Sequence, residues 1–373
     1  MTALLGKKKP ARARRLCLLA LVTAVIFLLA QFPACAEYLF ARGITRGLSS
    51  LIGAVTNLFP FSFYEWTAVI LIAGGLCVLV GLIVLLAQRQ FRRAGRWVYR
   101  LAAAALCVLL AFGLLYAPLY NRASVSDALA LPEAEVNEQT VYDAAAFFVD
   151  RLNESSAKAE RDAEGNAVSP HTFEETARLL NAQFASLGSD YFSSRTVRPK
   201  AVALSVPMSY LGITGIYFPF YAESNVNVNI PAYEIPSTMA HEMAHARGVS
   251  REGDANVVSY VLCVLAEDDF LNYSGLMPVT ARLLNSLPEE QFDELYARLD
   301  PAVKREYANA SAHYDKYEGV IDSISGFFND LFLKANGVPG GTRSYGETTE
   351  SLVALYVLPV SYTHLTLPTI LRV

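Results

Sequence analysis

The sequence predicts a mainly α-helical protein with three N-terminal transmembrane helices and a larger helical domain that contains a small β-sheet. Hydrophobic residues make up 53% of the 373 residues, which is high for a soluble globule. This apolar excess is concentrated in the first third of the chain. Helical periodicity dominates the rest, except in residues 201–235, which are rich in β-branched and aromatic residues and are broken by glycine and proline.

The predicted membrane anchor occupies residues 1–120. Three runs in it, residues 16–34, 67–87 and 101–120, contain no Asp, Glu, Lys or Arg and are 19, 21 and 20 residues long. About 20 apolar residues in a helix cross the roughly 30 Å hydrocarbon core of a bilayer, so each run predicts one span. The first run also fits a cleaved signal peptide, because a basic segment precedes it and the small-residue exit at residues 33–36 follows it.

The charges are distributed unevenly. Residues 1–100 carry 13 Lys and Arg against 2 acidic residues, whereas the remaining residues carry 18 basic and 33 acidic residues. The basic residues cluster before the first run and between the second and third. By the positive-inside rule, the N-terminus and residues 88–100 are cytoplasmic and the large domain is extracytoplasmic. Because both clusters adjoin spans and the large domain is acidic, we expect contact with membrane lipid and no nucleic-acid partner.

Residues 121–138 are expected to form a linker and residues 139–356 the large domain. Within this domain, residues 225–230 alternate amide and aliphatic side chains, which predicts a strand packed on one face only. Cys263 is the only cysteine of the domain, so no internal disulfide is expected. Residues 357–373 lack amphipathic order and resemble a translated sequencing adapter, so we treat them as a non-native tail.

The strongest chemical signal is the sequence His-Glu-Met-Ala-His at residues 241–245. On a helix, His241 and His245 share one face, so both imidazoles can bind one metal ion. Glu242 lies one step round, where it can reach a water on that metal. This HExxH arrangement is typical of zinc metallopeptidases, in which the ion activates water and the carboxylate is the general base. We therefore predict a Zn²⁺ site here.

A catalytic zinc needs a third protein ligand and an open position for water. A second helix that follows the motif and folds back over it would place Glu252 and Asn256, four residues apart, on one face. We predict Glu252 as the third ligand and Asn256 as a hydrogen-bond partner of a ligating histidine, outside the ligand set. Asp254 is the alternative ligand, favoured if this segment is extended rather than helical.

These residues predict a membrane-anchored zinc-dependent endopeptidase, with a helical, zincin-like metallopeptidase domain. The motif is short and occurs by chance in on the order of one in a hundred chains of this size. Two of the five histidines of the chain are in it, however, and an acidic helix follows at the right distance. The alternative is a catalytically inactive metal-binding sensor or scaffold. The intact Glu242 argues against that alternative, because a binding-only site needs no base.

The three-span beginning and four segments of the chain resemble a bacterial membrane-anchored family of unknown function with an HExxH zinc-peptidase signature. These segments are residues 217–227, 241–248, 252–256 and 341–346. Residues 252–256 are also similar to the Glu-x-x-Ala-Asp step of HtpX-like membrane metallopeptidases, in which the glutamate is the third zinc ligand. The resemblance implies the same roles for Glu252 and Asn256 and a location in the bacterial cytoplasmic membrane. The family pattern has Glu where this chain has Asp254, which counts against Asp254 as a ligand.

Two further parts of a peptidase site can be sought in the sequence. A donor that stabilises the oxyanion is expected, and Tyr345 is the first candidate, followed by Arg343, His313 and Tyr217. In the gluzincin-type peptidases that the site resembles, an edge strand before the motif helix pairs with the substrate. Residues 225–229 occupy that place, which implies an extended or unfolded peptide substrate. An edge strand made polar to avoid aggregation is the alternative. Nothing in the sequence specifies an oligomeric state.

Overall fold

The computed structural model describes residues 11–336, 338 and 348–361, and the chain divides into two compact units. The first unit comprises Met1–Leu48 and Trp66–Arg122, and the second comprises Ser49–Glu65 and Ala123–Val373.

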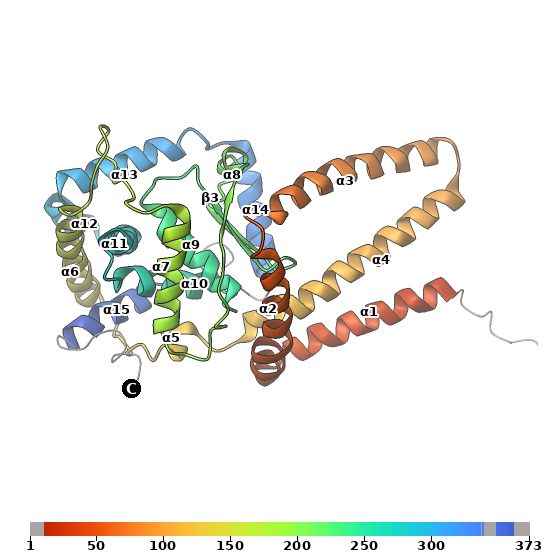
Figure 1. Ribbon diagram of the computed structural model, residues 1–373, viewed down its shortest axis with the longest axis horizontal. Coiled ribbons are helices and arrows are strands. Elements are labelled where there is room, and N and C mark those ends of the chain that lie inside the picture. The colour runs from red at the N-terminus through yellow and green to blue at the C-terminus, as the bar shows by residue number, and fades with distance from the viewer. Residues whose placement is uncertain (1–10, 337, 339–347, 362–373) are drawn as a thin grey trace, which may run out of the picture. The chain divides into compact units, whose positions relative to one another are not determined.

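The first unit is built on long apolar helices. Among the described residues, α1 (Ala11–Ala30), α3 (Phe63–Ala87) and α4 (Phe91–Leu115) are long and apolar enough to cross a membrane (Figure 1). Helix α3 begins in the second unit and continues into the first. These three helices support the predicted membrane anchor.

The helix boundaries in the first unit differ from those expected. Helix α4 starts at Phe91 and ends at Leu115, whereas the sequence predicted a span over residues 101–120 and assigned residues 88–100 to a cytoplasmic segment outside it. The arginine-rich residues continue the helix because arginine is a strong helix former. The chain also forms a π-helix at Cys35–Ile44 and helix α2 at Thr45–Thr56, neither of which the sequence predicted, and a 3₁₀ turn at Ala117–Asn121.

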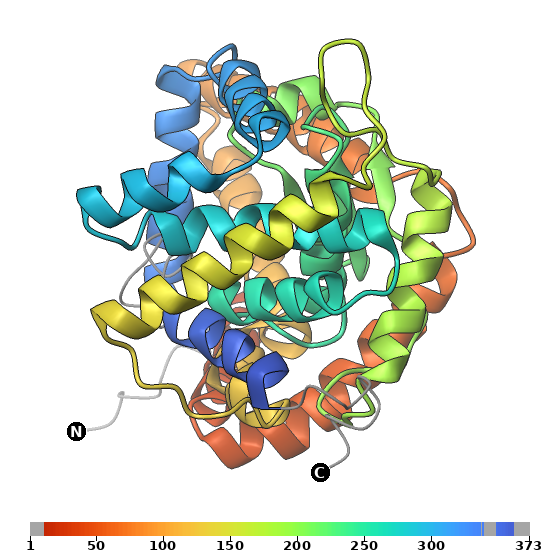
Figure 2. The same cartoon turned by 90° about the vertical axis from the view of Figure 1, so that its left-hand side faces the viewer.

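The second unit is mainly helical. After α5 (Val125–Ala128) its helices are α6 (Glu138–Ser156), α7 (Phe173–Ser186), α8 (Ser205–Ser209), α9 (Glu234–Ala246), α10 (Glu252–Val264), α11 (Asp269–Leu284), α12 (Glu289–Arg298), α13 (Pro301–Tyr314), α14 (Val320–Ala335) and α15 (Thr349–Ser361). Helices α6, α9, α10 and α11 pack together and form the core, and Figure 2 shows α6 lying along α11. Fully buried side chains of this core include Phe148, Met239, Met243, Leu262, Leu271 and Leu276.

Two segments set apart by the sequence analysis contain helices. The expected linker, residues 121–138, contains α5, whose Ser124 N-cap accepts a hydrogen bond from the Asp127 N–H. The expected non-native tail begins inside α15, which extends to Ser361, and its residues 362–373 lie outside the described part of the chain.

The described strands form one three-stranded sheet in the order β1-β3-β2. Strand β1 (Lys200–Val202) is parallel to β3 (Glu223–Asn227), and β2 (Gly215–Phe218) is antiparallel to β3. The small sheet that the sequence predicted is therefore present.

The expectation that residues 225–229 form an edge strand is wrong, because β3 is the central strand. Its amide side chains are buried because they are hydrogen-bonded inside the unit. Asn225 Oδ1 accepts from Ser62 Oγ at 2.6 Å, and Asn227 Nδ2 donates to the Ile213 carbonyl at 2.8 Å. Within β3 both faces are buried, with Asn225 and Asn227 on one and Val226 on the other, whereas Val228, just beyond the strand, is exposed.

Candidate metal centre

The motif helix α9 and the following helix α10 form the two walls of the site. Helix α9 lies against β3, where Ser224 Oγ donates a 2.7 Å hydrogen bond to the Glu242 carbonyl. After α9, Gly248 adopts φ +101°, a left-handed conformation that favours glycine. The Val249 N–H then donates to the Ala244 carbonyl at 3.2 Å, which closes the turn. Helix α10 follows at once and packs back against α9.

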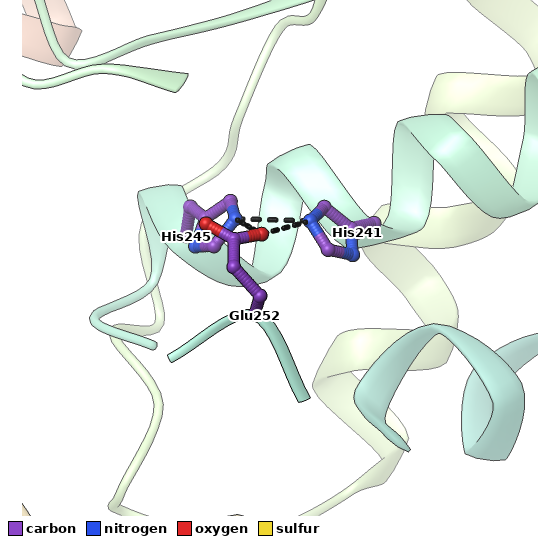
Figure 3. Close-up of side chains that lie close together, drawn as sticks. All are labelled: His241, His245 and Glu252. Atoms are coloured by element: carbon purple, nitrogen blue, oxygen red, sulfur yellow. Dashed lines mark hydrogen bonds and ion pairs between the residues drawn. The ribbon is translucent and has the colours of Figure 1, made fainter. Parts of the chain in front are cut away.

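Three side chains from these helices converge on one point: His241, His245 and Glu252 (Figure 3). His241 Nε2 is 3.0 Å from His245 Nε2 and 3.1 Å from Glu252 Oε2. His245 Nε2 is 3.4 Å from the same Glu252 oxygen. The two nitrogens and the oxygen therefore form a nearly equilateral triangle.

The triangle fits a zinc ion. Tetrahedral coordination with bonds of about 2.0–2.1 Å separates neighbouring ligand atoms by roughly 3.3 Å. The three observed separations are 3.0, 3.1 and 3.4 Å, close to that value. Two imidazoles and one carboxylate are also a donor set found in catalytic zinc sites, which leave the fourth position open.

The remaining ring nitrogens have acceptors of their own. His241 Nδ1 lies 2.9 Å from Asn256 Oδ1, and His245 Nδ1 lies 2.8 Å from the Val249 carbonyl oxygen. In a neutral imidazole, a nitrogen that faces an acceptor carries the proton, which leaves the lone pair on the other nitrogen. Both histidines therefore present Nε2 to the triangle, as metal ligands held by such partners do.

The triangle attracts positive charge. Burial lowers the pKa of His245, but the charge of Glu252 and the hydrogen bond to it outweigh burial and raise the pKa of His245 to about 9. Burial likewise raises the pKa of Glu252, but the two histidines hold it well below its usual range. Without a metal ion, a proton on His245 compensates Glu252, and a divalent cation can displace that proton.

Glu242 is next to His241 in sequence, but its carboxylate is not one of the three grouped ligands and lies against Gly215 of β2. It is buried, and Oε2 has no hydrogen-bond partner among the described residues. Burial raises the pKa of Glu242 to about 7, although His241 and His245 lower it. A buried, unpaired carboxylate oxygen with a pKa near neutrality suits a general base.

Gly215 on β2 is a site residue that the sequence analysis missed. A Cβ on Gly215 would lie 2.6 Å from Glu242 Oε1 and 2.7 Å from Glu242 Cγ, so only glycine fits beside this carboxylate. A glycine inside a strand-like segment often marks such a close approach, which is the signal that could have identified it. The Val249 carbonyl was also missed, because a backbone acceptor has no residue-type signal.

The structure places the alternative ligand Asp254 outside the triangle. Asp254 Oδ2 accepts a 2.7 Å hydrogen bond from Arg251 Nε, and Oδ1 accepts one of 3.3 Å from the Val125 N–H. The segment is helical from Glu252 onwards, so Asp254 is directed away from the histidines. Asn256 lies on the same helix face as Glu252, at His241.

Of the candidate oxyanion donors that the structure describes, Tyr217 contacts a residue of the triangle and His313 does not. The Tyr217 ring stacks on His245 with a centroid separation of 6.4 Å. Burial raises the pKa of Tyr217, and its side chain is hydrogen-bonded to Ser49. His313 Nε2 lies 2.9 Å from the Asn229 carbonyl oxygen and is not part of the triangle. Tyr217 is therefore hydrogen-bonded to Ser49, and His313 to the Asn229 carbonyl.

The remaining donor candidates, Tyr345 and Arg343, lie outside the described residues.

Fold and site together define a mainly helical protein with three helices apolar enough to span a membrane and a His/His/Glu cluster next to a buried glutamate. The chain belongs to the family described as "Protein of unknown function (DUF3810)", which matches residues 40–353. No curated protein and no solved structure is significantly similar to the chain.

Proposed function

We propose that this protein is a membrane-anchored, zinc-dependent endopeptidase. The observation that carries the proposal is the pairing of the ligand triangle with Glu242, which is buried beside it with an unpaired oxygen. Stability alone does not explain this arrangement, because a buried carboxylate oxygen without a hydrogen-bond partner is destabilising. A catalytic role does explain it.

In this mechanism His241, His245 and Glu252 would hold the ion, with Asn256 and the Val249 carbonyl fixing the two rings. Zinc bound there would supply Lewis acidity and lower the pKa of water towards about 7. Glu242, with a pKa near 7, would accept the proton of the attacking water and then donate a proton to the leaving amine.

The substrate we propose is an extended or unfolded peptide. Strand β2 (Gly215–Phe218) pairs with β3 along one edge, and in the described residues no strand pairs with its other edge. Gly215 brings the backbone of this strand into contact with Glu242. A peptide added to the open edge of β2 would therefore pass close to the base. The strand proposed to pair with the substrate is therefore β2, and not the central strand β3.

We place the domain on the extracytoplasmic side of a bacterial cytoplasmic membrane. The support is the arginine-rich segment at the start of α4, together with the basic N-terminus.

Cleavage of an unfolded, fluorophore-labelled protein by the full-length protein in detergent with zinc tests the function. The proposal predicts that Glu242→Gln binds zinc as the wild type does but cleaves at least about a hundredfold more slowly. Equal cleavage by wild type and variant would reject the mechanism. A wild type that binds zinc and cleaves nothing would favour the inactive sensor or scaffold.

A further inference from the structure

Helix α14 turns its apolar side away from the protein. Seven large apolar residues are exposed on it: Val320, Ile321, Ile324, Phe327, Phe328, Leu331 and Phe332. At about 100° per residue they fall in a single stripe roughly 140° wide. Leu333, the buried residue of the helix, lies on the opposite side, and so does Asp322. The Asp322 carboxylate packs against Gly212, since a Cβ added to Gly212 would lie 2.6 Å from Asp322 Oδ1.

This orientation is the reverse of the usual one. A surface helix of a soluble domain buries its apolar stripe and exposes its polar side. Here Phe327 is 65% exposed and Phe328 62% exposed, whereas Leu333 is 1% exposed. A stripe of this size on the surface indicates contact with another apolar phase or a partner.

Further apolar residues are exposed on α8 and beside it, next to the start of α14. Tyr210 contacts Tyr317, with ring centroids 5.0 Å apart, and joins the end of α8 to the segment before α14. Leu204, Val206 and Leu211 are also exposed.

Hydrogen bonds connect β3 and the segment before α8 to the start of α3, within the second unit. Glu223 Oε2 accepts hydrogen bonds from the N–H groups of Phe63 and Tyr64, at 3.0 and 3.2 Å. The carboxylate of Glu65 in turn accepts from the N–H groups of Ala203 and Leu204. The chain continues from Glu65 directly into the most apolar candidate span. Leu204, just before α8, therefore lies beside the first residues of α3, the helix that leads into this candidate span.

We infer that α14 is an interfacial helix that lies in the plane of the membrane surface, with lipid covering its apolar stripe. The width of the stripe and its three phenylalanines match such a helix. Its link through Tyr317, Tyr210 and Leu204 to the start of α3 brings it close to the segment that leads into a candidate membrane span. The charged residues on α14 are Asp322, Asp330 and Lys334, which give no positive excess. Binding is therefore driven by apolar burial and needs no anionic lipid.

The test uses the full-length protein in liposomes, with a single environment-sensitive dye on an introduced cysteine. Cys17, Cys35, Cys77 and Cys107 are replaced by alanine, and Cys263 is buried. The labelled variants are Ile324→Cys and Phe328→Cys on the stripe. Gly326→Cys is the matched control, because it lies about 160° round the helix from Phe328 and a Cβ there meets nothing within 4 Å.

Lipids that carry a nitroxide near the headgroup should quench the two stripe labels several times more strongly than the control label. The ratio of stripe-label to control-label quenching should be the same in zwitterionic and anionic liposomes. It should also be the same in the Glu242→Gln background, because membrane contact does not depend on catalysis. Stripe labels quenched mainly by aqueous iodide would overturn the inference. Stripe labels shielded from both quenchers would also overturn it and would indicate a peptide or a second copy on this surface.

Discussion

His241 Nε2 lies 3.1 Å from Glu252 Oε2, although the two residues are on different helices. The Gly248 turn makes this possible, because it reverses the chain within a few residues and sets α10 against α9. The third corner of the triangle therefore depends on a short, local connection. Everything proposed about zinc rests on this geometry.

Removing the acceptor at His241 should weaken zinc binding. Asn256 Oδ1 orients His241 by a 2.9 Å contact to Nδ1, so Asn256→Ala should lower zinc affinity about 10–100-fold. Asn256→Asp, which keeps an acceptor, should bind at least as tightly as the wild type. Competition with a chromogenic chelator measures both affinities. Equal affinities for wild type and the alanine variant would show that Asn256 does not support zinc binding.

Filling the space at Gly215 should impair catalysis and leave metal binding intact. A Cβ there would lie 2.6 Å from Glu242 Oε1, so Gly215→Ala must displace the base. We expect kcat for peptide cleavage to fall about a hundredfold, with an unchanged zinc content. Gly319→Ala is the control, because nothing lies within 4 Å of its Cβ. Loss of zinc from the Gly215 variant would show that it disturbs the ligands instead.

Zinc affinity should rise with pH. The pKa of His245 is raised to about 9, so below that pH zinc must displace one proton, and affinity should increase about tenfold per pH unit. The stability of the metal-free protein should instead fall as the pH rises. Stability contributed by protonated His245 is fully present below its ordinary pKa of 6.5 and is lost as the pH rises towards about 9. Chelator competition and thermal unfolding across this range measure the two trends.

A buried ion pair outside the ligand triangle should contribute strongly to stability. Glu306 accepts from Arg161 Nη1 at 2.7 Å and from the Tyr273 hydroxyl, and its other oxygen accepts from the Ala167 N–H at 2.8 Å. Glu306→Gln should destabilise the protein by about 3 kcal/mol, because it leaves Arg161 without its charge partner.

The exposed pair Lys158–Asp269, with side chains 59% and 60% exposed, is the control for this prediction. Asp269→Asn should cost less than about 1 kcal/mol. Thermal unfolding of the detergent-solubilised protein compares the two variants. Similar shifts in Tm would show that burial does not determine how much an ion pair contributes to stability here.

The convergence of the site residues could be predicted because it depends on local periodicity. Spacings of four residues place His241 with His245, and Glu252 with Asn256, once each segment is helical. The fold class and the apolar spans follow from composition in the same way. Zinc and peptidase activity stay predictions.

The parts that could not be predicted depend on contacts distant in sequence. Strand β3 is central because β1 arrives from more than twenty residues upstream to pair with it, and no local pattern encodes that pairing. The fit of Gly215 against Glu242 likewise requires the antiparallel register of β2 and β3. The orientation of α14 was also hidden, because a helical wheel shows an apolar stripe but not the side on which it lies.

Metal analysis of the purified full-length protein tests the central claim most directly. The wild type should carry one zinc ion per chain, and so should Asp254→Asn, whose carboxylate lies outside the triangle. Glu252→Gln, which removes the third corner of the triangle, should lose the zinc. A wild type without zinc, or a Glu252→Gln variant that keeps its full zinc content, would contradict the account.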